Sequence, residues 1–139
     1  MPIQIREYTP ADEAAVVALW RARDLTRPWN DPHADVARAY REFPTLLLVA
    51  EDRGEIVGTV MGGDDGHRGW IYYLASAAAR AGEGIGRALV AEVERRLRAR
   101  GCPKVQLMVR TENHRVAAYY AELGYADASV TVLGKRLDG

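Results

Sequence analysis

The chain has 139 residues, of which 48% are hydrophobic, and its 19 basic residues balance its 19 acidic ones. This size suits one compact domain over residues 1–139, and the balanced charge excludes a protein that attracts nucleic acid or an anionic membrane through its overall field. Cys102 is the only cysteine, so an internal disulfide cannot form and no metal site is expected. No apolar run reaches the ~18 residues of a membrane helix, and acidic residues interrupt the region where a signal peptide is apolar. We therefore expect a cytoplasmic protein with no membrane partner.

The N-terminal half alternates between helix and strand patterns. Residues 3–8 alternate like a short strand, and residues 9–24 begin with Thr-Pro and an acidic first turn, which is typical of a helix start. Residues 25–33 hold two prolines, an asparagine and an aspartate and predict a loop, before a second helix over 34–43. Within residues 45–76, three apolar runs separated by "EDRGE" and "GGDDGHRG" predict three antiparallel strands.

The C-terminal half predicts a helix, a strand, a second helix and a last strand. The first helix shows an apolar residue at every fourth position: Ile85, Leu89, Val93 and Leu97. A strand over 104–110, a helix over 112–124 and a strand over 128–137 follow. The whole order is βααβββαβαβ, an α/β fold in which the helix after Ser76 leads into a strand parallel to the one before it.

Three glycines lie at the start of that helix, at positions 82, 84 and 86. Free backbone N–H groups and the positive end of a helix dipole converge there, which favours an anion, and glycines allow a phosphate to approach the backbone closely. The alternative is an ordinary tight turn packed under a helix. A Walker A loop is excluded because Arg87 and Ala88 follow Gly86, and a dinucleotide fingerprint is excluded because Leu89 stands where its third glycine belongs.

Two segments, "AGEGIGRAL" and "NHRVAAYYAELGY", resemble the two motifs of the GNAT family of N-acetyltransferases. In the second segment, Asn113, Tyr120, Gly124 and Tyr125 fall on the family's Asn, Tyr, Gly and aromatic positions. More narrowly, "RPWNDP", "GTVMGGDDGHRG", "RGCPK" and "LGKRL" resemble the YpeA-type bacterial acetyltransferases. The resemblance implies a GNAT-like mixed, mostly antiparallel central sheet with helices on both faces and with strands four and five parallel and splayed. It also implies acetyl-CoA as the co-substrate.

The resemblance further implies which residues contact coenzyme A. They are Leu74, Ala75 and Ser76 on the fourth strand, Gly82, Glu83, Gly84, Ile85, Gly86 and Arg87 in the loop, and Asn113 at the later helix. Tyr120 matches the tyrosine that donates a proton to the coenzyme sulfur, although a core tyrosine would fit the same position. Asn113 could equally serve only as a helix N-cap. Ala81 departs from the motif, which has Gln or Arg there.

In the family the acceptor enters opposite the coenzyme, near the loop between the first two helices and the turn between strands three and four. The matching residues here are Arg27, Trp29, Asp31, Asp64, Asp65 and His67. Both signs of charge among them suit an amino-acid-like or peptide N-terminal acceptor, but the same residue types also form ordinary turns. Met108 stands where relatives carry a glutamate base, and Glu51, Tyr72, Tyr73 and the turn residues remain as candidates for that base.

The predicted function is transfer of an acetyl group from acetyl-CoA to a primary amine of a small molecule or peptide. The amine attacks the thioester directly in a ternary complex. The alternative is a non-catalytic acyl-CoA-binding sensor with the same fold, which the altered loop would suit. No nucleic-acid partner is expected, and homodimer formation is left open.

Overall fold

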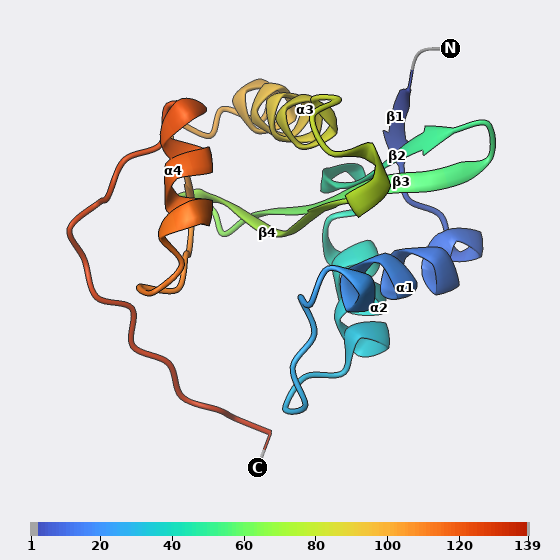
Figure 1. The fold of residues 1–139 in the computed structure, drawn as a ribbon. Helices are drawn as coiled ribbons and strands as arrows, with labels where there is room; N and C mark the ends of the chain where they lie inside the picture. Colours follow the sequence, from blue (N-terminus) through green and yellow to red (C-terminus); the bar gives the residue numbers. More distant parts are fainter. Residues whose placement is uncertain (1–2, 139) are drawn as a thin grey trace. The chain divides into compact units, whose positions relative to one another are not determined.

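The computed structural model describes residues 3–138. Its internal contacts divide the chain into two compact units, Met1–Met108 and Val109–Gly139. Figure 1 shows the elements of both units along the chain.

The first unit is built on one five-stranded sheet with the order β1-β2-β3-β4-β5. The strands are β1 (Gln4–Glu7), β2 (Leu47–Asp52), β3 (Glu55–Asp64), β4 (Gly69–Ser76) and β5 (Val105–Leu107). The first three pairings are antiparallel, and β4 pairs with β5 in parallel. The predicted mixed, mostly antiparallel sheet is therefore confirmed.

The pairing of β4 with β5 is short. Only Gly69–Ile71 of β4 pairs, with Val105–Leu107 of β5, although β4 continues to Ser76. No strand among the described residues pairs with that edge of β4 beyond Ile71. The separation leaves backbone N–H and C=O groups of β4 free for another partner, because a strand edge exposes one row of such groups.

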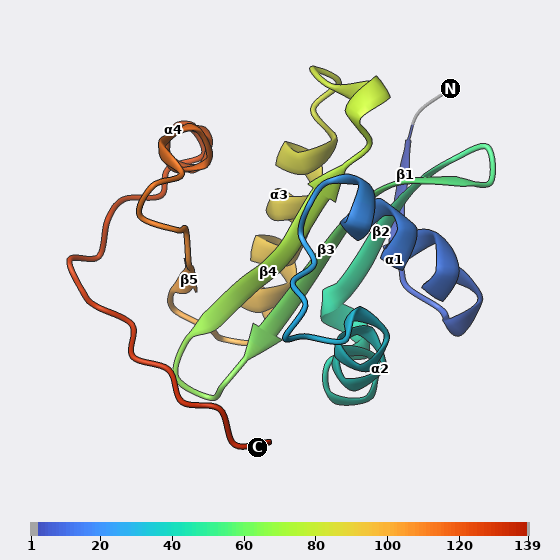
Figure 2. The same ribbon diagram turned by 60° about the horizontal axis from the view of Figure 1, so that its bottom comes forward.

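Helices cover both faces of this sheet, as Figure 2 shows: α1 and α2 lie on one face and α3 lies on the other. The helices are α1 (Glu13–Ala22), α2 (Pro32–Glu42) and α3 (Ile85–Ala99), with short 3-10 turns η1 (Pro10–Asp12), η2 (Pro44–Leu46) and η3 (Ala78–Arg80). The predicted apolar stripe of α3, from Ile85 to Leu97, is buried against the sheet. On the opposite face, Trp20 of α1 and Val36 of α2 are fully buried with β2 side chains.

The second unit contains one helix, α4 (His114–Glu122), and an irregular C-terminal segment. The side chain of Asn113 accepts a hydrogen bond from the Val116 N–H at 3.2 Å and so caps the helix start. The strand predicted over 128–137 is wrong: the structure has no strand there. Ser129 adopts a left-handed φ of 58°, and its N–H donates to Asp127 at 2.7 Å, which forms a turn. The described part of this unit offers no second strand with which an extended segment could pair.

Candidate functional site

The glycine loop between η3 and α3 depends on two left-handed residues. Gly82 has a φ of 84°, and Gly84, the N-cap of α3, has a φ of 78°. A side chain at either position would meet no atom within 4 Å, so the dihedral angle and not crowding requires glycine there. The space beside the loop is therefore open.

The first turn of α3 presents unpaired backbone N–H groups to that open space. The first hydrogen bond of the helix runs from the Ala88 N–H to the Gly84 carbonyl at 3.0 Å, and no side chain caps the start. The amides of Ile85, Gly86 and Arg87 consequently have no acceptor among the described residues. Three free donors at the positive end of a helix dipole are the groups that an anion would need there.

Arg80 and Glu83, two charged residues of the loop, are paired with each other. Arg80 donates from Nε to Glu83 Oε2 at 2.8 Å and from Nη2 to Asp52 Oδ2 at 2.9 Å. The hydrogen bond from Arg80 lowers the pKa of Glu83, so its carboxyl group is ionised and its negative charge is balanced by the Arg80 guanidinium. Because Asp52 ends β2, this ion-pair network ties the loop to the sheet.

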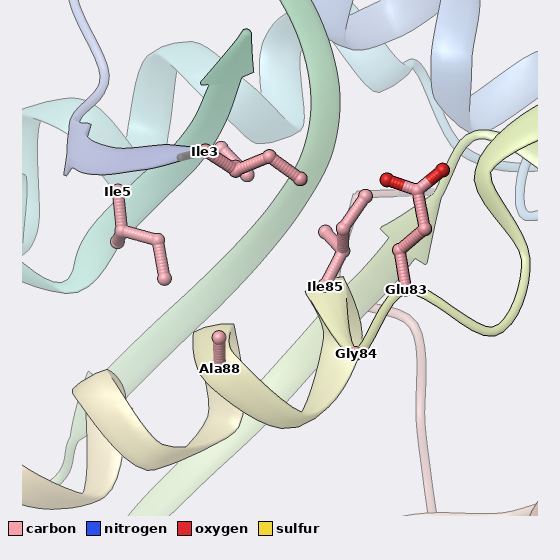
Figure 3. Close-up of a pocket in the computed structure, with 7 residues that line it drawn as sticks. Ile3, Ile5, Glu83, Gly84, Ile85 and Ala88 are labelled. Carbon is pink, nitrogen blue, oxygen red and sulfur yellow. The ribbon is translucent and has the colours of Figure 1, made fainter. Parts of the chain in front are cut away.

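A small hollow of about 80 Å³ lies beside the loop, between β1 and the first turns of α3. Figure 3 shows Ile3 and Ile5 on one side of it and Ile85 and Ala88 on the other. Pockets that enclose a drug-sized ligand measure roughly 300–1,000 Å³. The hollow is thus an apolar packing gap, too small for a coenzyme.

Gly58 of β3, which was not among the predicted site residues, lies directly under the loop end of α3. A Cβ built there would lie 2.5 Å from Ile85 Cγ2 and 2.9 Å from Leu89 Cδ1. Only glycine lets the first turn of α3 approach the sheet this closely. The available signal was a glycine inside a strand pattern, since such a glycine often marks the close approach of another backbone or side chain.

The β4 strand contains a bulge where it separates from β5. Tyr72 pairs with Met61 and Ala75 pairs with Thr59, so β4 has one residue more than β3 between these pairs. Tyr73 sits at this bulge with a left-handed φ of 52°. Paired residues face the same side of a sheet, and Thr59 contacts Trp20 of α1. Tyr72, Tyr73 and Ala75 consequently all face α1 and α2.

Three contacts hold Tyr73 in place. Its ring stacks on the Trp20 ring with centroids 3.9 Å apart, and its hydroxyl donates to Asp35 Oδ2 at 2.7 Å. Its carbonyl accepts a hydrogen bond from Thr59 Oγ1 at 3.2 Å. Burial, and then the bond to Asp35, raise the pKa of Tyr73, so its hydroxyl is protonated at neutral pH. A non-glycine residue in this conformation costs roughly 1–2 kcal/mol, which these contacts offset.

The predicted acceptor residues before α2 have different surroundings. Arg27 Nη1 donates to the carbonyls of Asp24 at 2.9 Å and Thr26 at 2.8 Å, which folds the loop around the guanidinium. Asp31 accepts from the His33 N–H at 2.9 Å and caps α2. Trp29 is 55% exposed and presents its indole ring to solvent.

The predicted acceptor residues in the β3–β4 turn shape that turn. Asp64 accepts from the Gly66 N–H at 2.9 Å and from Arg100 Nε at 3.1 Å. Asp65 accepts from the Arg68 and His67 amides, and these bonds lower its pKa to about 2. Gly69, which pairs with Asp64 at the turn, lies about 13 Å along β4 from Tyr73. The structure does not bring Asp64, Asp65 and His67 to the bulge, and their role in acceptor binding stays a prediction.

Tyr120, the predicted proton donor, lies in the second unit. It is 9% exposed, and the rings of Tyr119 and Tyr125 contact it edge-on at centroid distances of 5.4 and 5.6 Å. Burial, together with the Tyr119 hydroxyl, raises the pKa of Tyr120 to about 12. The hydroxyl is therefore protonated at neutral pH, as a proton donor must be.

The model of the acetyltransferase (GNAT) family matches residues 15–125. The chain belongs to this family. An acetyltransferase from Pectobacterium atrosepticum is 50% identical to this GNAT protein over 97% of the chain and 96% of the relative. One from Sodalis glossinidius is 48% identical over the same shares. These relatives confirm that the protein is an acetyltransferase.

Solved structures confirm the GNAT fold. Ard1 from Thermoplasma volcanium has a TM-score of 0.81 at 25% identity, covering 91% of this chain and 84% of its own. Naa20 from Chaetomium thermophilum has a TM-score of 0.76 at 28% identity, covering 88% and 70%. None of the helices described in the GNAT protein is long and apolar enough to cross a membrane. The narrower YpeA-type resemblance stays a prediction.

Proposed function

We propose that this acetyltransferase moves the acetyl group of acetyl-CoA to a primary amine by direct attack in a ternary complex. The observation that carries the proposal is the unpaired edge of β4, which leads through a short loop to the three free amides of α3. Both features lie in the first unit, on one continuous stretch of chain. Their donors suit an amide-containing chain that ends in a pyrophosphate.

The chain's residues fit the two ends of coenzyme A in different ways. The amides of Ile85, Gly86 and Arg87 would receive the pyrophosphate above the left-handed Gly82 and Gly84. The free edge of β4 at Leu74, Ala75 and Ser76 would hydrogen-bond the pantetheine amides as an added strand does. Arg80 balances the charge of Glu83, so that the carboxylate does not stand alone beside the phosphates.

The reaction needs a bond between the amine nitrogen and the acetyl carbon and cleavage of the bond between that carbon and sulfur. The amine loses a proton, and the departing thiolate gains one. A backbone N–H at the β4 bulge would stabilise the oxyanion, because a bulge leaves backbone groups outside the ladder. Tyr120 would protonate the sulfur, a role supported by its protonated hydroxyl and its place in the second motif.

The acceptor would enter beside the loop before α2, where Trp29 is exposed and Arg27 is held by the loop carbonyls. A ring and a cation in one loop suit an acceptor that carries both an apolar part and a carboxylate, such as an amino acid or a peptide N-terminus. The Naa20 structure contains a bisubstrate analogue, which supports an acceptor bound together with the coenzyme.

Calorimetry with acetyl-CoA, followed by an amine panel, tests the proposal. The panel holds amino acids, polyamines, aminosugars and peptides with free N-termini, and free thiol release reports turnover. We expect micromolar acetyl-CoA binding and turnover with at least one amine. A folded Gly84→Val variant is the control and should lose acetyl-CoA binding, since valine does not tolerate the φ of 78°. Binding without turnover on any amine would contradict the proposed reaction.

A further inference from the structure

Thr59 of β3 connects the core to the backbone of the β4 bulge. Its side chain is buried, with the residue 1% exposed. Thr59 Oγ1 accepts from Trp20 Nε1 at 2.9 Å and donates to the Tyr73 carbonyl at 3.2 Å. Because the indole can only donate, the hydroxyl proton is left to point at that carbonyl. The direction of the Thr59 hydrogen bond is thereby fixed.

This bond sets the orientation of the peptide plane between Tyr73 and Leu74. Carbonyls of a regular strand lie in the sheet and point at the neighbouring strand's amides, whereas this one bonds a side chain on the face of α1 and α2. The peptide bond is trans, so the Leu74 N–H points away from the Tyr73 carbonyl. It is therefore directed away from Thr59, and Leu74 lies beyond Ile71, on the stretch of β4 that β5 leaves unpaired.

We propose that Thr59 is a positioning residue of the acetyltransferase, which aims the Leu74 N–H at the carbonyl oxygen of the acetyl thioester. The inference rests on the proposed function, because it requires acetyl-CoA along the free edge of β4. The ring of Tyr73 is held by Trp20 and Asp35, but Thr59 is the residue that bonds the Tyr73 carbonyl. Without that bond the peptide plane can rotate back toward a regular strand geometry.

Four variants distinguish a role of Thr59 in orienting the Leu74 N–H from a role in stabilising the core. Thr59→Val removes the hydroxyl and keeps the shape, and Thr59→Ser keeps the hydroxyl. Trp20→Phe removes the indole donor but leaves the bond from Thr59 to the Tyr73 carbonyl. The double variant Thr59→Val/Trp20→Phe removes both partners, so that no buried N–H is left unpaired. It provides the test should Thr59→Val not fold.

The readout is the infrared carbonyl band of bound acetyl-CoA labelled with ¹³C at the thioester carbonyl. A hydrogen bond to the oxygen lowers this frequency, and packing changes elsewhere do not. We expect the wild type, Thr59→Ser and Trp20→Phe to show the lowered band. Thr59→Val and the double variant should return it toward the free value, with turnover reduced at least ~10-fold and acetyl-CoA affinity changed less than ~3-fold.

Three outcomes would overturn the inference. One is a thioester carbonyl band at the same frequency in the double variant as in Trp20→Phe, although only the double variant lacks the Thr59 hydroxyl. Another is an equal return of the band in Trp20→Phe and Thr59→Val, which would trace the effect to core packing. The third is wild-type protein that binds no acetyl-CoA in calorimetry. That result would overturn the proposed function first, and this inference with it.

Discussion

Gly58→Ala should disturb the proposed anion site by adding a methyl group on the face of the sheet that α3 covers. The new Cβ would lie 2.5 Å from Ile85 Cγ2, 2.9 Å from Leu89 Cδ1 and 3.3 Å from the Ala50 Cβ. Carbon atoms in contact prefer a separation of about 3.5–4.0 Å, so the first turn of α3 must move outward by about 1 Å. Overpacking of this kind costs about 1–3 kcal/mol, which lowers the melting temperature by about 4–12 °C.

The displaced turn carries the amides on which the proposed pyrophosphate site depends. A hydrogen bond near 2.9 Å that lengthens by about 1 Å is lost, and each bond to a charged group contributes about 1.5–3 kcal/mol. Partial loss of one or two such bonds predicts acetyl-CoA binding weakened by about 10- to 100-fold. Calorimetry measures the affinity, and thermal unfolding measures the stability of the same sample.

Gly69→Ala is the matched control. Its Cβ would lie 2.7 Å from Leu97 Cδ1 and 3.3 Å from Cys102 Sγ, so it crowds α3 at the far end of the helix. We expect a similar loss of stability, with acetyl-CoA affinity within about threefold of wild type. Equal losses of affinity in Gly58→Ala and Gly69→Ala would refute the reasoning, as would a Gly58→Ala variant that loses only stability.

Three further variants probe charge and proton transfer. Ala81→Arg places a cation beside the loop amides and should tighten acetyl-CoA binding about 3- to 10-fold in low salt, an effect that added salt diminishes; unchanged affinity in low salt contradicts it. Tyr120→Phe should lower turnover about 100-fold with coenzyme affinity nearly intact, and equal turnover assigns Tyr120 to packing. Arg95 and then Arg96 lower the pKa of Glu92 to about 2. A carboxyl group whose pKa is lower in the folded than in the unfolded protein stabilises the fold above the unfolded-state pKa, and this stabilisation is lost as the pH falls. Glu92→Gln should therefore flatten the fall in stability between about pH 5 and pH 2 in thermal unfolding. An unchanged slope would show that this ion pair does not stabilise the fold.

Sequence patterns predicted correctly those elements whose geometry depends only on residues close together in the chain. The four-residue spacing from Ile85 to Leu97 predicted the buried face of α3, because helical periodicity alone decides which side chains share a face. The strand over 128–137 was predicted on alternation, but a strand also needs a partner. Val130 and Val132 alternate as a strand would, yet both are exposed in an irregular segment.

The candidate site was predicted only where one stretch of chain builds it. The glycine loop and the amides after it are contiguous, so the sequence predicted directly which backbone N–H groups are free at the start of α3. The bulge at Tyr73 depends on Thr59 and Trp20, which lie 14 and 53 positions away along the chain. Nothing in "WIYYLAS" marks an extra residue, because a bulge is defined only by the partner strand.

Carboxylates in turns show a second reason why the sequence does not identify the binding residues. Asp64 and Asp65 were predicted to receive a cationic acceptor, and both accept backbone N–H groups of their own turn. Aspartate is favoured in turns for this same hydrogen bonding. Residue type and spacing therefore cannot separate a turn former from a ligand, whereas the observed partners show which bonds are already made.

Trp29→Ala tests the acceptor site most directly, because its indole ring is 55% exposed and its removal should leave the core intact. Loss of a stacking contact predicts an acceptor KM about 5- to 10-fold higher, with unchanged acetyl-CoA affinity and a stability change within about 0.5 kcal/mol. Arg27→Ala should raise KM as well, but it also removes the bonds to the Asp24 and Thr26 carbonyls, so the loop should lose stability. Trp29→Phe keeps a ring and should restore most of the wild-type KM. If Trp29→Ala changed only the affinity for acetyl-CoA, the loop before α2 would border the coenzyme, and the acceptor would bind elsewhere.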